Sequence, residues 1–223
     1  LTSIRSLLTG QVTTYEGPVV TLRRVRLDID PPPLTPVYLG ALGPEMLRLA
    51  GELADGVALN WCTPGQVLWS MDRIAEGAAR VGRNPAEVRI VGYIRVCVDN
   101  DLDLARQSMA RAVMPYALGS RVPSDRDKAF GYRAHFERME FSSILSKLDS
   151  MRQQGSSREQ LADAFPAELL ERIGYYGPAS GAAEAFRRLS QGLDVAIVRV
   201  VSARPGINNV LHTMTACRPE LLS

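Results

Sequence analysis

Lysine is scarce in this sequence, since only Lys128 and Lys147 stand among its 26 basic residues. Against 24 acidic residues, the formal net charge is only +2. A chain so close to neutral lacks the positive field that draws proteins to nucleic acid or to an anionic membrane surface. We therefore expect neither partner, and we attribute the arginine excess to GC-rich coding rather than to a function.

Cysteine and histidine are also few. Cys62, Cys97 and Cys217 fall in no CxxC or Cys/His spacing, which argues against a disulfide framework and a structural zinc site. His135 and His212 have no second ligand at metal-binding spacing, so we predict structural or solvated roles and no metal site. The cysteine usage suits a reducing compartment, and we expect a cytoplasmic protein.

Long apolar runs are missing as well. No run approaches the roughly 20 residues that cross a bilayer, and the first residues lack the apolar core of a signal peptide. We expect no membrane segment. The sequence starts at Leu1 rather than Met, which suggests that the natural N-terminus lies upstream. A composition of 46% hydrophobic and 22% charged residues is typical of a globular domain.

What the sequence does contain is an alternation of apolar runs and helical patterns. The runs at 37–39, 57–59, 88–98 and 195–201 are continuous, as in parallel strands buried on both faces, and amphipathic helical patterns separate them. Such units build either a doubly wound sheet or a (β/α)₈ barrel, and only four of them are visible. We expect one domain over 1–223, with a helix end and hairpin in 1–36 and a helical insertion in 116–157.

The most informative segment is the loop that follows the first of these runs. Gly40, Ala41, Leu42 and Gly43 stand between the end of a strand and a helix that Pro44 opens. Small residues there expose backbone N–H groups at the positive end of the helix dipole, where a phosphate binds well. The alternative is a tight turn with no ligand. The segment does not match the GxGxxG fingerprint of dinucleotide-binding folds.

The equivalent position in the next unit holds Asn60, Trp61 and Cys62. Asn60 offers a donor and an acceptor and Trp61 a stacking face, although Trp61 could simply pack over the strand ends. Cys62 belongs to no motif that supplies a base, so we do not assign it as a nucleophile. Arg95 and Arg199 lie inside apolar runs, where a charge needs either a bound anion or an acidic partner.

Several stretches together resemble the luciferase-like monooxygenase superfamily, in particular its branch that depends on the deazaflavin coenzyme F420. Residues 7–17 resemble the family's "LLTGE…YEG" segment, and 36–44 resemble its fifth strand and the following loop. Residues 49–57 match an "AGELADG" signature that leads into the sixth strand, and 194–201 resemble the eighth. The arginine excess suits the actinobacterial genomes in which this branch is common.

The resemblance implies a (β/α)₈ barrel, of which about the last four βα units are present. It implies oxidoreductase chemistry, namely hydride transfer or monooxygenation of a small-molecule substrate, with F420 or, alternatively, flavin mononucleotide (FMN). Gly40, Ala41, Leu42, Gly43 and Asn60 would bind the cofactor. Catalytic residues remain unassigned because the family's first four strands, which carry most of them, have no counterpart here.

Two other functions stay open at this point. A partial barrel exposes sheet edges, so we expect a homodimer. The chain could also be a non-catalytic protein that binds a phosphate-bearing ligand or serves only to dimerise. A phosphate-binding lyase or isomerase would need a strand-end lysine or paired carboxylates, which the sequence does not offer.

Overall fold

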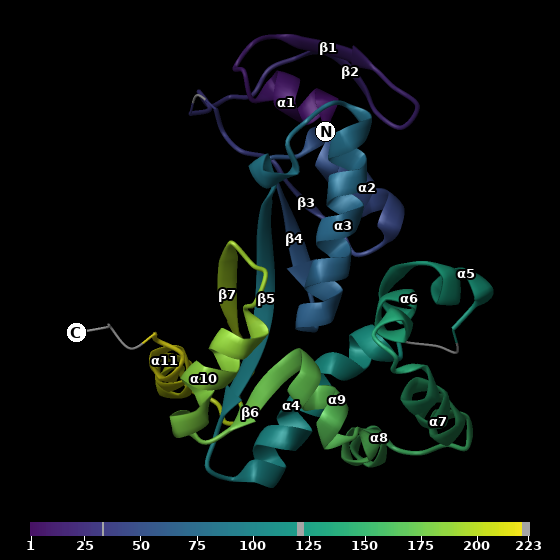
Figure 1. Cartoon of the computed structure of the whole chain (residues 1–223), viewed down its shortest axis with the longest axis vertical. Coiled ribbons are helices and arrows are strands. Elements are labelled where there is room, and N and C mark those ends of the chain that lie inside the picture. Colours follow the sequence, from purple (N-terminus) through teal and green to yellow (C-terminus); the bar gives the residue numbers. More distant parts are fainter. Residues whose placement is uncertain (33, 120–122, 220–223) are drawn as a thin grey trace.

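A two-stranded hairpin precedes the main sheet. After α1 (Thr2–Leu7), β1 (Thr13–Glu16) and β2 (Thr21–Val25) pair antiparallel. The computed structural model, which describes residues 1–32, 34–119 and 123–219, places this hairpin at one end of the molecule (Figure 1). A hairpin thus lies where two β-prone runs flank Gly17 and Pro18 in the sequence.

The main sheet is parallel and is organised around one long strand, β5 (Arg89–Val98). β4 (Gly56–Asn60) pairs with the first half of β5 and in turn with β3 (Tyr38–Gly40). β6 (Gly174–Gly177) pairs with the last residues of β5, while β7 (Val195–Val200) pairs with its other edge. Among the described residues the sheet has five strands and does not close into a barrel.

The strand β6 was not expected from the sequence. Tyr175 and Tyr176 lie outside the four apolar runs of the sequence, but they form the centre of a fifth parallel strand. The segment is short, begins and ends with glycine and follows directly on the last residue of a helix, so its pattern does not resemble a strand. Only its pairing with Arg95 to Val98 of β5 defines it.

Four helices cover one face of this sheet. α2 (Pro44–Leu53) and α3 (Pro64–Arg80) pack on β4 and β5 through a core that includes Leu47, Val57 and Ile74. α10 (Ala179–Leu189) and α11 (Ile207–Ala216) pack beside them through a second core around Val96 and Leu189. Each fully buried aliphatic side chain of this kind contributes roughly 1.5–3 kcal/mol relative to exposure.

The segment between β5 and β6 is helical throughout its described part. Its helices are packed together around Phe136, Phe141 and Phe165, and the same core takes in Trp61 and Cys97 from the ends of the sheet strands. Figure 1 shows them as a group beside the ends of β4 and β5. The helices are α4 (Leu102–Ala117), α5 (Asp125–Ala129), α6 (Gly131–Arg138), α7 (Ser142–Gln153), α8 (Arg158–Ala164) and α9 (Ala167–Ile173).

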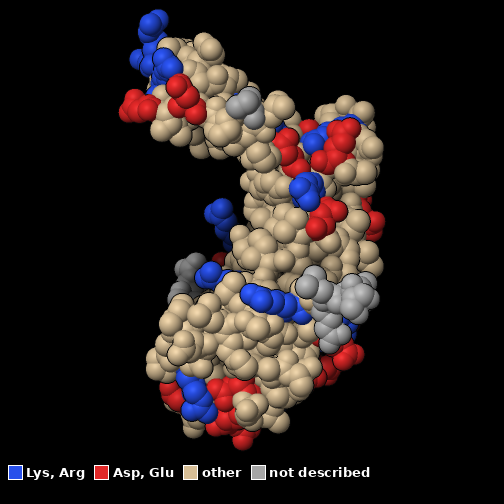
Figure 2. Space-filling model, turned by 90° about the vertical axis from the view of Figure 1, so that its left-hand side faces the viewer, with Lys and Arg blue, Asp and Glu red and all other residues tan. Residues whose placement is uncertain are grey.

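The opposite face of the sheet is largely open. Strand register places Tyr38, Arg89, Tyr93 and Arg199 on this face, and all four are exposed. Figure 2 shows a molecule that is deeply hollowed between the hairpin end and the helical end. No helix in the described part of the chain is long and apolar enough to span a membrane.

Candidate functional site

A cavity of about 590 Å³ lies over the carboxyl ends of β3 and β4. Its walls come from the loop after β3, from the two neighbouring strands and from the helices inserted after β5. The lining residues include all five that the sequence singled out, Gly40, Ala41, Leu42, Gly43 and Asn60. Ligands in parallel α/β folds bind at this end of the strands.

The loop after β3 is shaped to receive an anion. Pro44 starts α2, as expected, and Gly43 at its N-cap provides no side-chain cap for the first turn. A Cβ atom added to Gly40 or Gly43 would meet nothing within 4 Å, so the space above both residues is open. Uncapped N–H groups, the helix dipole and open space together fit the phosphate of a nucleotide-like cofactor.

Asn60, at the end of β4, is the centre of a polar network beside this loop. Its Nδ2 donates to the hydroxyl oxygen of Tyr132 at 2.5 Å, and its Oδ1 accepts a hydrogen bond from Arg95. The guanidinium of Arg95 stacks over Trp61, 4.1 Å from the ring centroid. Asn60 is therefore held in one orientation, with donor and acceptor both engaged.

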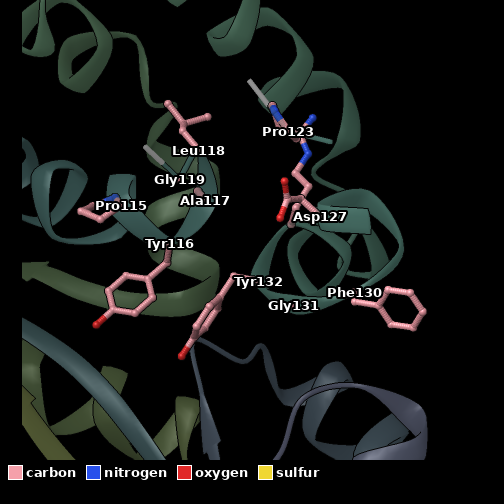
Figure 3. Close-up of a pocket in the computed structure, with 11 residues that line it drawn as sticks. Pro115, Tyr116, Ala117, Leu118, Gly119, Pro123, Asp127, Phe130, Gly131 and Tyr132 are labelled. Carbon is pink, nitrogen blue, oxygen red and sulfur yellow. The ribbon is translucent and has the colours of Figure 1, made fainter. Parts of the chain in front are cut away.

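The insertion contributes an aromatic wall. Tyr116 and Tyr132 lie edge to face, with ring centroids 4.8 Å apart, and extend side by side toward the strand ends (Figure 3). Phe130 points away from both and is 69% exposed. Phe130 and Tyr132 also line a second cavity of about 360 Å³, so the two cavities adjoin.

Arg138 of α6 closes the other side of the loop. Its Nη2 donates to the carbonyl oxygen of Leu42 at 2.8 Å, and its guanidinium lies 4.9 Å from the centroid of the Trp69 ring. Burial lowers the pKa of Arg138 from its ordinary value. A half-buried guanidinium at the cavity wall makes the site positive and favours an anionic ligand.

Behind this wall lies a neutral pair, His135 and Cys62. Burial lowers the pKa of His135 to about 4 and raises that of the Cys62 thiol to about 12. Their Nε2 and Sγ atoms are 3.8 Å apart. Both groups are therefore uncharged near neutral pH, and this pair does not resemble an activated thiolate–imidazolium nucleophile.

The other residues singled out from the sequence differ in burial. Arg95 is buried, as expected, at 6% exposure, but Arg199 is exposed, so its predicted burial is wrong. Arg199 lies near the end of β7, on the sheet face that no helix covers. Trp61 does pack into the core. No group of three potential metal ligands occurs among the described residues.

Sequence reasoning missed three residues that line the site, Tyr93, Tyr132 and Arg138. Tyr93 had a usable signal, since it stands two residues before Arg95 on the same strand and thus shares its face. For Tyr132 and Arg138 the sequence contains no such signal. They belong to a polar helical stretch and meet Asn60 and Leu42 across 72 and 96 residues of chain.

Comparison with known proteins gives this site a context. A family model of luciferase-like monooxygenases matches residues 1–195. A 5,10-methylenetetrahydromethanopterin reductase of Archaeoglobus fulgidus is 29% identical over 177 residues, which cover 76% of this chain and 53% of that protein. An F420-dependent glucose-6-phosphate dehydrogenase of Nakamurella multipartita is 29% identical over 106 residues, 47% of this chain and 31% of the relative.

Solved structures share the fold. The coenzyme F420-dependent tetrahydromethanopterin reductase of Methanopyrus kandleri aligns with a TM-score of 0.73 and 20% identity, covering 96% of this chain and 59% of that one. An F420-dependent secondary alcohol dehydrogenase aligns with a TM-score of 0.64 and 18% identity, covering 97% and 59%.

The chain spans about half the length, or less, of the curated relatives it matches. The resemblance inferred from the sequence is confirmed, and so is the α/β fold. The family match extends over most of the chain and includes the loop after β3 and the end of β4. The chain therefore belongs to the luciferase-like monooxygenase family.

Proposed function

We propose that the protein is an oxidoreductase that binds coenzyme F420 in the cavity over β3 and β4 and serves hydride transfer to or from a small organic substrate. Three of the proteins described above are named as F420-dependent, which supports the deazaflavin over FMN. FMN remains the alternative cofactor, because both molecules carry a phosphate and a flat tricyclic ring.

The observation that carries this proposal is the uncapped start of α2 above two open glycines. Gly40 and Gly43 leave room for a phosphate against the first-turn N–H groups, and Arg138 supplies positive charge at the same wall. Hydrogen bonds from such groups to a charged ligand contribute roughly 1.5–3 kcal/mol each. The cavity of about 590 Å³ is large enough for a cofactor of this class.

When bound, F420 supplies a two-electron centre that accepts or donates hydride. The residues of this chain position it and shape its surroundings. The loop amides hold the phosphate, and Arg138 fixes the loop by donating to the Leu42 carbonyl. Asn60 and Tyr132, held by their mutual hydrogen bond, offer fixed polar groups to the cofactor. Tyr93 and Phe130 add ring surface to the cavity wall and so reduce the access of water.

The test is cofactor binding by the purified chain, with Gly43→Ala as the decisive variant. Because Gly43 has an extended backbone and free space around it, alanine leaves the fold intact but fills the phosphate position. Gly65→Ala is the matched control. Gly65 lies at the start of α3, where an added Cβ meets only the Thr63 hydroxyl oxygen at 3.9 Å, and it does not line this cavity.

Equilibrium dialysis against F420 and against FMN gives the readout. We expect saturable binding of F420, weakened about tenfold or more by Gly43→Ala and unchanged by Gly65→Ala. If FMN binds more tightly than F420, the cofactor assigned to this site changes from the deazaflavin to the flavin. No binding of either at micromolar concentration would overturn the proposal and favour the rival function, a non-catalytic protein that associates through its open sheet face.

The homodimer expected from the sequence remains a prediction. The open face of the main sheet gives a reason for association, since an uncovered sheet tends to pair with another surface. Sedimentation of the same chain, with and without F420, measures the oligomeric state directly.

A further inference from the structure

Arg95 is a buried cation in an unusual setting. Its side chain is 6% exposed, and its guanidinium lies against the rings of Trp61 and Tyr116, 4.1 and 5.9 Å from their centroids. It donates to the side-chain oxygen of Asn60 and, at 3.5 Å, to the carbonyl oxygen of Tyr93. All of these partners are formally neutral.

No carboxylate of the described residues forms an ion pair with this guanidinium. Arg95 appears in none of the ion pairs formed by the described residues, unlike the buried Arg133, which binds Asp149 at 2.7 Å. Burial lowers the pKa of Arg95, and the nearby cation Arg199 lowers it further. Burying a guanidinium without a counter-charge is costly.

Arg199 adds a second positive charge close to Arg95. It is the register partner of Arg95 on the adjacent parallel strand β7, so both side chains leave the same face of the sheet. Arg199 is exposed and forms no ion pair with any described residue. Like charges on neighbouring strands repel each other, so this pair of arginines is unfavourable to the sheet by itself.

The two arginines lie next to the candidate site. Arg95 bonds to Asn60 and Tyr93, which both line the main cavity, and it stands two residues farther along β5 than Tyr93. The pair thus lies at the carboxyl ends of β5 and β7, on the open face. The loop after β3, which we assign to the cofactor phosphate, lies on the far side of β4.

We propose that Arg95 and Arg199 together bind an anionic group, a carboxylate or a phosphate, of the substrate. Arg95 forms the fixed half of the site because Trp61, Tyr116 and Asn60 hold its guanidinium plane in place. Arg199 forms the solvent-facing half. Two arginines paired in register on neighbouring strands can direct their guanidinium groups to the oxygen atoms of one oxyanion. The assignment to substrate rests on the proposed function, whereas the anion site itself does not.

Trp61 provides a direct probe of this site because it stacks on Arg95. The chain has two tryptophans, so Trp69→Phe leaves Trp61 as the only indole emitter. We would titrate this variant with inorganic phosphate, with acetate and with choline chloride as a salt control, and record Trp61 fluorescence at constant ionic strength. The same titrations follow in Arg95→Gln, Arg199→Gln and Arg89→Gln derivatives.

Arg89 is the matched control. It lies on β5 on the same face as Arg95, is exposed and forms no ion pair with a described residue, but it stands about 20 Å away along the strand. Arg199→Gln replaces an exposed side chain and should therefore fold normally even if Arg95→Gln, a change in the core, does not. Far-ultraviolet circular dichroism checks that each variant is folded.

We expect a saturable fluorescence change with at least one of the two anions and none with choline chloride. The midpoint should rise about tenfold or more in Arg95→Gln, severalfold in Arg199→Gln and not at all in Arg89→Gln. The anion with the lower midpoint identifies the group that the substrate carries. The absence of saturation with both anions, or an equal shift in Arg89→Gln, would overturn the proposal.

A last titration separates this inference from the cofactor assignment. If F420 binds by dialysis and leaves the phosphate midpoint unchanged, the arginines serve a second ligand, as proposed. If F420 competes with phosphate at the Trp61 probe, the pair belongs to the cofactor and the assignment to substrate is wrong. If anions bind but F420 does not, the proposed function fails while the anion site stands.

Discussion

The imidazole Nε2 of His135 lies 2.8 Å from the carbonyl oxygen of Trp61 and joins the inserted helix α6 to the end of strand β4. Trp61 has a φ of 53°, in the left-handed region that a residue with a bulky side chain seldom adopts. This backbone turn stands directly after Asn60. The histidine thus holds the strained bend that orients the polar network of the site.

The first prediction concerns pH. The pKa of His135 is about 4 in the folded chain, against an ordinary value of 6.5. Between these values the unfolded chain binds a proton that the folded chain does not, so the free energy of unfolding falls as pH decreases. We expect a loss of about 3 kcal/mol between pH 6.5 and 4 from this group. Urea unfolding across that range measures it.

His135→Asn should abolish this part of the pH dependence, since asparagine does not titrate. The matched variant is His212→Asn, which replaces an exposed histidine on α11 and should leave the dependence in place. An unchanged pH profile in His135→Asn would show that other groups cause it.

The second prediction concerns Asn60. Asn60→Leu removes the oxygen that accepts from Arg95 and the amide that donates to Tyr132. We expect the free energy of unfolding to fall by about 1–3 kcal/mol, because a buried guanidinium loses its acceptor. Asn60→Asp retains the acceptor and adds a negative charge beside Arg95. Its stability should stay close to that of the parent chain.

The same aspartate variant also tests the inferred anion site. A carboxylate at position 60 would neutralise Arg95 from within, so phosphate or acetate should bind several times more weakly in Asn60→Asp. Binding as tight as in the parent chain would contradict a role for Arg95 in holding the anion.

Local patterns predicted those parts of the fold that depend on neighbours in sequence. Thr63 and Gln66 have the spacing of an N-cap and its third helical residue, and the Thr63 hydroxyl oxygen accepts from the Gln66 backbone amide at 3.1 Å at the start of α3. The return bond of a full capping box, from the Thr63 N–H to the side-chain oxygen of Gln66, does not form. At the start of α8, Ser157 and Gln160 have the same spacing and form both halves of the box.

Features that depend on distant segments were not predictable in this way. β6 is defined by pairing with β5, across a helical segment of some seventy residues, and Tyr132 meets Asn60 across 72 residues. The burial of His135 likewise follows from α6 packing on Trp61, although charged residues, Arg133 and Glu137, stand two positions away on either side. The loop at Gly40 and Gly43 was recognisable because its chemistry lies in consecutive residues.

The third prediction concerns the contact between α2 and α3. A Cβ atom added to Gly77 would lie 1.9 Å from the carbonyl oxygen of Arg48, so the two helix backbones approach too closely for any side chain there. Gly77→Ala must push α2 away, and we expect a loss of about 1–3 kcal/mol or more in the free energy of unfolding. Because α2 carries the cavity loop at its start, F420 binding should weaken as well.

Gly65→Ala again serves as the control, because its added methyl group has room at the start of α3. Thermal unfolding of the two variants side by side gives the comparison. Equal melting temperatures would show that the helices can separate without cost and would contradict the tight contact.

The fourth prediction concerns Asp149 of α7, which is 8% exposed and accepts hydrogen bonds from two arginines. Its Oδ2 lies 2.7 Å from Arg133 Nη1, and its Oδ1 lies 2.8 Å from Arg152 Nη2. Asp149→Ala leaves the buried Arg133 with Glu137, 2.6 Å from its Nε, as its remaining acidic partner among the described residues, and we expect a loss of about 1.5–3 kcal/mol. Glu52→Ala, which breaks a more exposed pair with Arg80, should cost less than about 1 kcal/mol.

Asp149→Ala should also affect the candidate site, because Arg133 lies on α6 between Tyr132 and His135. If the ion pair with Asp149 fixes α6, Asp149→Ala should also release the contact of His135 with Trp61 and alter Trp61 fluorescence at denaturant concentrations below global unfolding. Fluorescence and circular dichroism transitions should then separate, with fluorescence changing first. Coincident transitions would show instead that α6 remains bound to the end of β4 without Asp149.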